Sequence, residues 1–200
     1  MSPLKSLSGL KSHRTGDETA LDFDIAIRKR YASIRLGIPE EISATVLHIG
    51  AEQTWIATGS SSEPAAMLEL AIGSSKTASE HFKHTPPTPA DLENAILTIE
   101  DEITRARTMT NGNSTVFTTD ELVREIALVA GLPDQLELLL SRDAVERTFE
   151  RLAALTLGQL PAQECFPRSN AFAASALILR EFMHHLQFLT ITITTCRRKE

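Results

Sequence analysis

Val46-Leu-His-Ile-Gly-Ala-Glu-Gln-Thr-Trp-Ile56 is the stretch that decides the fold, because two apolar runs flank a short segment that begins at Gly50. We predict a strand over residues 44–50, a tight turn, and a second strand over residues 54–59. A third strand is expected over residues 66–72, where large apolar side chains alternate with other residues. Together the three segments predict an antiparallel meander.

Helical periodicity replaces this pattern downstream. Thr88, Pro89 and Asp91 are suited to be the N-cap, the first helical residue and the capping-box acid of a helix. An apolar stripe at helical spacing follows, formed by Leu92, Ala95, Ile96, Ile99, Ile103 and Ala106. Thr118 and Glu121 form a second capping-box pair at the start of another helix.

Later segments complete the predicted order of elements. Helices are expected over residues 143–155 and 170–187, and strands over residues 115–117 and 189–194. The fold class is therefore α/β, with a three-stranded antiparallel meander followed by helices and two further strands.

The N-terminal part is organised differently. Residues 1–18 are rich in Ser, Lys and Gly without periodicity, which predicts a flexible tail. Residues 19–43 are predicted to be a linking helix region, with a short, partly exposed helix in the basic stretch 22–36. We expect residues 19–200 to form a single domain.

The charge balance excludes several classes of partner. Twenty Lys and Arg against 26 Asp and Glu give a net charge of −6, and no dense basic run occurs, so we expect no nucleic-acid partner and no anionic membrane partner. Eight Phe, one Trp and one Tyr are too few for a base-stacking platform. No apolar run reaches the roughly 18 residues of a membrane span, and no stretch of signal-peptide length begins the chain. Cys165 and Cys196 lack metal-binding spacing, which favours a reducing, cytoplasmic setting.

One segment is placed as a phosphate-binding P-loop would be, between a strand and a helix. Gly73-Ser-Ser-Lys-Thr77 carries the lysine and the hydroxyl of that motif. The motif also needs glycine directly before the lysine and again five residues earlier, where this chain has Ser75 and Leu70. We therefore interpret the segment as an ordinary strand-to-helix turn.

The histidines are the other candidates for chemistry. His81 and His84 lie three residues apart, and His184 and His185 are adjacent. A zinc site needs three or four convergent ligands, and the sequence offers no second cluster to complete either pair. We predict surface histidines and no metal site.

Five segments, in consistent order and spacing, give the chain a family resemblance. They are the hairpin of residues 47–56, Met67-Leu-Glu-Leu-Ala-Ile-Gly73 with the helix through Glu80-His-Phe82, Pro86-Pro-Thr-Pro89, Leu152-Ala-Ala-Leu-Thr156, and Arg168-Ser-Asn170 with Ala174-Ser-Ala-Leu-Ile-Leu179. The stretch from about residue 21 to 195 resembles the second lobe of the exopolyphosphatase/guanosine pentaphosphate phosphatase (Ppx/GppA) family. The resemblance implies an actin-like ATPase (ribonuclease H-like) lobe. It also implies magnesium-dependent hydrolysis of terminal phosphates in polyphosphate or guanosine pentaphosphate, in a cleft between two lobes.

The chain departs from the family at the chemistry itself. The family aspartate at the end of the first strand is His48 here, and imidazole is a poor substitute for the oxygen ligands that magnesium prefers. Of the three glycines in the family turn only Gly50 remains, followed by Ala51 and Glu52. A carboxylate about 4 Å from a bound anion would oppose it by about 4 kcal/mol at an effective dielectric constant near 20.

Other family positions are also altered. The Gly-Gly-Thr loop after the fourth strand falls at Phe117-Thr-Thr119, without glycine. The catalytic glutamate falls near Asp24, and in one register Ala26 takes its place. The catalytic candidates are therefore Glu52 and Asp24, and we expect no metal ligand.

The turn supplies the candidates for phosphate binding, which are Gly50, Ala51, Gln53 and Thr54. From the resemblance we expect a catalytically eroded domain that acts in binding, regulation or assembly. The alternative is an active phosphohydrolase of polyphosphate or guanosine pentaphosphate, which would need magnesium and could be completed by a partner that supplies the other lobe. Two hundred residues leave little room for a first lobe, so we expect a homodimer or a separate first-lobe partner, and polyphosphate or a phosphorylated nucleotide as possible ligands.

Overall fold

A computed structural model describes residues 15–110, 114–157 and 166–195. Its centre is a six-stranded sheet in the order β3-β2-β1-β4-β6-β5. Strands β1 (Ala44–Ile49), β2 (Thr54–Gly59) and β3 (Ala66–Leu70) pair antiparallel, which confirms the predicted meander. Next come β4 (Thr115–Thr118), parallel to β1, and β6 (Thr190–Thr194), parallel to β4.

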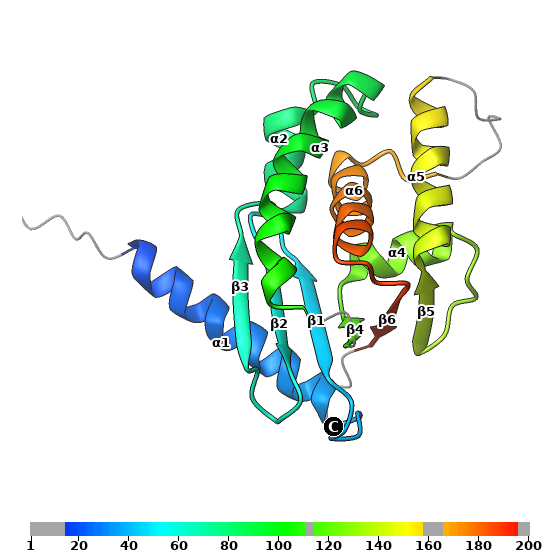
Figure 1. Ribbon diagram of the computed structural model, residues 1–200. Helices are drawn as coiled ribbons and strands as arrows, with labels where there is room; N and C mark the ends of the chain where they lie inside the picture. The colour runs from blue at the N-terminus through cyan, green and yellow to red at the C-terminus, as the bar shows by residue number, and fades with distance from the viewer. Residues whose placement is uncertain (1–14, 111–113, 158–165, 196–200) are drawn as a thin grey trace, which may run out of the picture.

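Helices cover both faces of the meander (Figure 1). On one face α1 (Thr15–Arg35) crosses the three strands, and its Ile27, Tyr31 and Ile34 form a cluster with Val46 and Trp55. Leu47, Ile49 and Ile56 point to the opposite face, where they join the main core beneath the other helices. Because successive side chains of a strand alternate between faces and both faces are covered, β1 and β2 are buried at nearly every position.

The helices of the main core lie together on the second face. They are α2 (Ser74–His81), α3 (Pro89–Thr104), the 3-10 helix η1 (Arg105–Thr108), α4 (Glu121–Val129), α5 (Arg142–Thr156) and α6 (Asn170–His185). The central helix is α6, which contacts α2, α3, α4 and α5 and has a nearly continuous run of buried residues. Such all-round burial explains its apolar sequence.

Helix α3 begins as its sequence predicts. The Asp91 amide donates to the Thr88 hydroxyl over 3.2 Å, and the Asp91 carboxylate accepts from the Thr88 amide over 2.9 Å. Both halves of the capping box are therefore present, with Pro89 at the first helical position. The buried stripe includes Leu92, Ala95, Ile99 and Ile103.

The prediction of only two strands after the meander was wrong. A third, β5 (Glu137–Ser141), pairs antiparallel with β6 at the edge of the sheet. Leu138 and Leu140 point into the core, whereas Leu139 lies on the outer face and is 62% exposed. An apolar side chain on the outer face removes the polar alternation that identifies a half-buried strand, so sequence periodicity did not reveal it.

Two boundaries also change. Residues 15–18 belong to α1 and not to the predicted tail, whereas residues 1–14 lie outside the described part of the chain. Helix α4 begins at Glu121, so Asp120 is its N-cap, and the capping box predicted for Thr118 and Glu121 is absent. Within the described ranges, no helix combines the length and apolarity that a membrane crossing requires.

Candidate functional site

The β1–β2 turn is held from behind by α2. The carbonyl oxygen of Gly50 accepts from the Ser74 amide over 2.8 Å, and that of Ala51 accepts from the amides of Ser75 and Lys76 over 2.9 and 3.0 Å. The turn thus takes up the first free N–H groups of α2, which otherwise form an anion-binding helix end.

Gly73 allows this close approach. A Cβ atom built there would lie 2.5 Å from the Ala51 carbonyl oxygen and 2.6 Å from the Gln53 amide nitrogen. Both contacts are with backbone, which cannot move aside as a flexible side chain can. Gly73 therefore lets the β1–β2 turn pack directly against the start of α2.

A buried carboxylate lies beside the end of β1. Since β1 and β4 run parallel, with Val46 opposite Phe117, the residues that follow β4 lie next to His48 and Ile49. The Asp120 carboxylate accepts from the Ile49 amide over 2.7 Å and lies 2.6 Å from His48 Nδ1. The Asp120 side chain is only 6% exposed.

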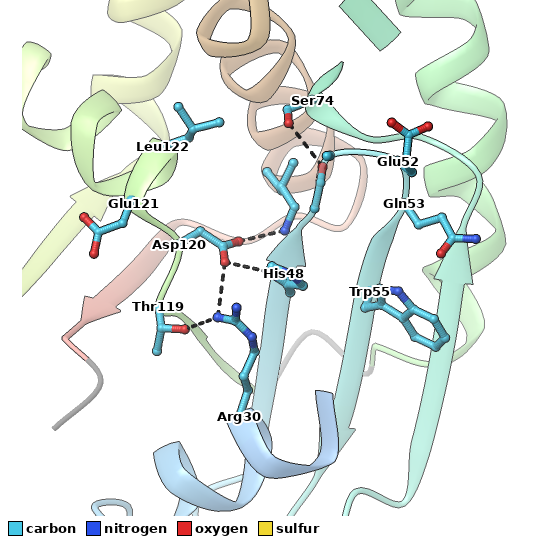
Figure 2. A pocket seen from close by; sticks show the side chains of 13 residues that line it. Arg30, His48, Glu52, Gln53, Trp55, Ser74, Thr119, Asp120, Glu121 and Leu122 are labelled. Atoms are coloured by element: carbon cyan, nitrogen blue, oxygen red, sulfur yellow. Dashed lines mark hydrogen bonds and ion pairs between the residues drawn. The ribbon is translucent and has the colours of Figure 1, made fainter. Parts of the chain in front are cut away.

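Arg30 reaches the same carboxylate from α1. Its Nη1 lies 3.6 Å from Asp120 Oδ1 and donates to the Thr119 hydroxyl over 2.6 Å. Figure 2 shows Arg30, His48 and Asp120 converging from α1, β1 and the loop after β4. Both Asp120 oxygens thus face nitrogen groups, one facing the Ile49 amide and the other facing His48 and Arg30.

These residues surround an open cavity of about 450 Å³. Its lining consists of Arg30, His48, Ile49, Gly50, Ala51, Glu52, Gln53, Trp55, Ser74, Thr119, Asp120, Glu121 and Leu122. The exposed carboxylates of Glu52 and Glu121 come from the turn and from the first residue of α4, on either side of the group formed by Arg30, His48 and Asp120 (Figure 2). The cavity therefore has both cationic and anionic side chains.

The four predicted phosphate-binding residues all lie in or next to the β1–β2 turn, but not all of them line the cavity. Gly50, Ala51 and Gln53 line the cavity. The Gln53 side-chain amide donates to the Glu69 carboxylate on β3. Thr54 is 1% exposed and absent from the lining, and its hydroxyl oxygen is buried with no hydrogen-bond partner among the described residues.

The two catalytic candidates are separated. Glu52 lines the cavity. Asp24 lies on α1 outside the cavity lining and pairs with Arg28 over 2.9 Å. The structure therefore brings Glu52, and not Asp24, to the site.

Sequence reasoning missed Asp120 and Arg30. A signal for Asp120 existed, since Thr118-Thr-Asp-Glu121 lies between a predicted strand and a predicted helix. Arg30 stands in a basic stretch with Arg28, Lys29 and Arg35, and nothing local distinguishes it from them. Only the packing of α1 on the meander brings it to the site.

The donor set does not match magnesium. Mg²⁺ takes oxygen ligands in a nearly octahedral arrangement, and a carboxylate ligand needs a free oxygen lone pair directed at the ion. His48 offers nitrogen and not oxygen, and Asp120 faces three nitrogen groups. These contacts favour a carboxylate that orders the loop and the imidazole over one that holds a metal.

Solved structures of known proteins share this fold. A Ppx/GppA family member from Aquifex aeolicus superposes with a TM-score of 0.67 at 15% identity, covering 84% of this chain and 57% of its own. An exopolyphosphatase from Cytophaga hutchinsonii gives a TM-score of 0.65 at 14% identity, covering 90% of this chain and 67% of its own. No family model and no curated protein sequence matches the chain.

These matches confirm the predicted fold. The chain has the mixed α/β, actin-like fold of the Ppx/GppA phosphatase structures. It spans only a little over half of the Aquifex chains, an extent expected for one lobe. At about 15% identity the likeness shows the fold alone.

Proposed function

We propose that this chain is a Ppx/GppA-like second lobe that acts in binding, regulation or assembly and does not hydrolyse phosphate. The single observation that carries the proposal is the engagement of Asp120 by His48, the Ile49 amide and Arg30. A catalytic magnesium would have to displace these groups from a side chain that is 6% exposed. We therefore assign Asp120 a structural role, in which its hydrogen bonds hold the end of β1 next to the loop after β4.

The turn has also changed in a way that supports the proposal. Gly50 donates to the Gln53 carbonyl over 2.9 Å, which closes the turn on itself. Ala51 and Glu52 are exposed, and each adds a side chain where the family has glycine. A phosphate at this turn would meet the Glu52 carboxylate, although solvent screening reduces that repulsion.

Arg30, a cation in the lining, gives the cavity a route to anion binding without catalysis. An arginine can hold a phosphate oxygen through paired N–H donors if it exchanges its contact with Thr119 for the ligand. Polyphosphate and phosphorylated nucleotides are the ligand classes that this function would use. A cytoplasmic setting is part of the same proposal.

The test is release of inorganic phosphate from polyphosphate and from guanosine pentaphosphate, with magnesium present. We expect no turnover above a buffer control. Turnover that is lost in both Arg30→Gln and Glu52→Gln, and kept in the exposed surface variant Glu63→Gln, would contradict the proposal.

An active phosphohydrolase is the second candidate, and one observation favours it. Glu52 is exposed in the lining, where its carboxylate could orient a water molecule. In that case Glu52→Gln alone would abolish turnover, whereas unchanged turnover in that variant would remove the candidate.

Assembly would involve a second copy of this chain or a separate first-lobe chain. Leu36, Leu136 and Leu139 are 85%, 73% and 62% exposed, and the first two line a hollow between the end of α1 and β5. Two exposed leucines that line one hollow are typical of an interface. Light scattering distinguishes the two partners, because only the first gives a dimer of the chain alone.

A further inference from the structure

A second group of ionisable side chains lies away from the cavity, between two helices of the main core. Glu181 and His185 stand one turn apart on α6, and Glu100 faces them from α3. The prediction that His184 and His185 are both surface residues was wrong for His185, whose side chain is 18% exposed, against 57% for His184.

The three ligand atoms are close together. His185 Nε2 lies 3.2 Å from Glu181 Oε2 and 3.3 Å from Glu100 Oε1, and all three atoms lie within 4.8 Å of one another. In a tetrahedral site with metal–ligand bonds of about 2.0 Å, neighbouring ligand atoms are about 3.3 Å apart. The distances from His185 Nε2 to the two carboxylate oxygens match this ligand–ligand separation.

The two carboxylate oxygens also lie in a particular direction from His185 Nε2. His185 Nε2 is buried, yet it makes no hydrogen bond within the described part of the chain, although both oxygens are near enough to accept one. The oxygens therefore lie off the line along which an N–H group donates. Ligands that share a metal with an imidazole lie off this line for the same reason, because the ion occupies it.

Neighbouring charged side chains hold the Glu181 carboxylate in position. Glu181 is 2% exposed, and its other oxygen accepts from Arg180, which also donates to Glu146 over 2.7 Å. These contacts hold the Glu181 side chain in place with its second oxygen directed at His185. Glu100 is 38% exposed and leaves the fourth position accessible to water.

We infer that Glu100, Glu181 and His185 form a binding site for a zinc-like divalent transition metal that ties α3 to α6. One imidazole and two carboxylates suit zinc, which takes nitrogen and oxygen ligands in a four-coordinate arrangement, with water as the fourth ligand. Magnesium and calcium are disfavoured because they bind oxygen ligands in larger numbers.

Binding requires one rearrangement. Arg107 Nη2 lies 3.1 Å from His185 Nδ1, and because arginine only donates, the imidazole hydrogen is then on Nε2. The metal takes the Nε2 lone pair, so this hydrogen moves to Nδ1 through solvent and Arg107 turns away. Arg107 is exposed, so its movement costs little.

The experiment is a calorimetric titration of the full chain with Zn²⁺, with Cys165 and Cys196 both changed to Ser so that thiolates do not compete. We expect one zinc per chain, and a visible spectrum of tetrahedral character when Co²⁺ replaces zinc. Glu100→Gln and His185→Gln each remove a ligand and should weaken binding by about 100-fold, the upper end of what loss of an outer-shell partner costs. The matched control, His184→Gln, should leave affinity within about twofold.

Two results would overturn the inference. One is the absence of stoichiometric zinc binding to the parent chain. The other is zinc binding that survives in Glu100→Gln or is lost equally in His184→Gln. Glu100→Gln is isosteric and partly exposed, so its thermal unfolding should match that of the parent without metal and leave the result interpretable.

Discussion

Two histidine–aspartate pairs in this chain have similar chemistry and different origins. At the start of α3, His84 Nδ1 lies 2.9 Å from an Asp91 oxygen, and the His84 side chain is 61% exposed. At the cavity, His48 Nδ1 lies 2.6 Å from an Asp120 oxygen, and the His48 side chain is 21% exposed. Both aspartates are buried at the start of a helix.

The two carboxylates serve different parts of the fold. Asp91 accepts from Thr88, three residues away, and so stabilises its own helix. Asp120 holds the N-cap position of α4 but makes no side-chain capping bond there. Its carboxylate instead accepts from Ile49, 71 residues away, and so joins two parallel strands. The first pair is a local cap, and the second is a tertiary joint.

The largest expected effect comes from removing the tertiary joint. Asp120→Ala leaves the Ile49 amide buried without an acceptor and deprives His48 and Arg30 of their shared partner. We expect a loss of about 3 kcal/mol in the free energy of unfolding, measured by urea denaturation.

Asp120→Asn is the matched control, because its amide oxygen can still accept from Ile49, and it should lose less. If Asp120→Ala lowers the free energy of unfolding by less than about 1 kcal/mol, Asp120 does not contribute more to stability than the local cap at Asp91.

A smaller effect is expected from the local cap. Asp91→Ala removes one half of the capping box and should cost about 1–2 kcal/mol in the free energy of unfolding. The exposed Asp101 on the same helix provides the control, and Asp101→Ala should change stability by less than about 0.5 kcal/mol. If Asp91→Ala proves as costly as Asp120→Ala, the distinction between cap and joint fails.

The smallest effect is a pH dependence. Burial raises the pKa of Asp91, but the hydrogen bonds from Thr88 and His84 lower it by more, so the pKa of this carboxyl lies well below its ordinary value. A lowered folded-state pKa gives stability that is complete above the unfolded-state value of about 4 and is lost as the pH falls through the folded-state value.

The stability difference between the parent and Asp91→Asn should therefore shrink as the pH falls below about 4. Urea midpoints measured as the pH is lowered check it. A difference that grows on acidification would contradict the assigned direction, and repeating the series in a His84→Gln background shows how much that histidine contributes.

The local elements could largely be predicted because their signals are short in range. Thr88, Pro89 and Asp91 define the start of α3 within four residues, and the hairpin around Gly50 is defined by two apolar runs. By contrast, β5 escaped prediction because its outward Leu139 is as apolar as its buried neighbours. Its pairing with β6 spans about 50 residues of chain, which no local pattern encodes.

The candidate site could be predicted only in part, for the same reason. Sequence identified the turn and Glu52, whereas the capping box predicted for Thr118 and Glu121 gives Asp120 no role. His185 is adjacent to His184 in sequence, but α6 turns by about 100° per residue. That rotation directs one imidazole towards Glu100 and Glu181 and leaves the other mostly exposed.

The sequence by itself determined the meander, the capped helix α3 and the histidine near the end of the first strand, since each depends on residue identity over a few positions. Tertiary structure alone decided which carboxylate faces that histidine and which cation joins it. Parallel pairing of β1 with β4 brings Asp120 to the strand end, and the packing of α1 brings Arg30. Hydrogen bonds act over about 3 Å in space whatever the separation along the chain, so partners 71 and 72 residues apart become visible only when the sheet is assembled.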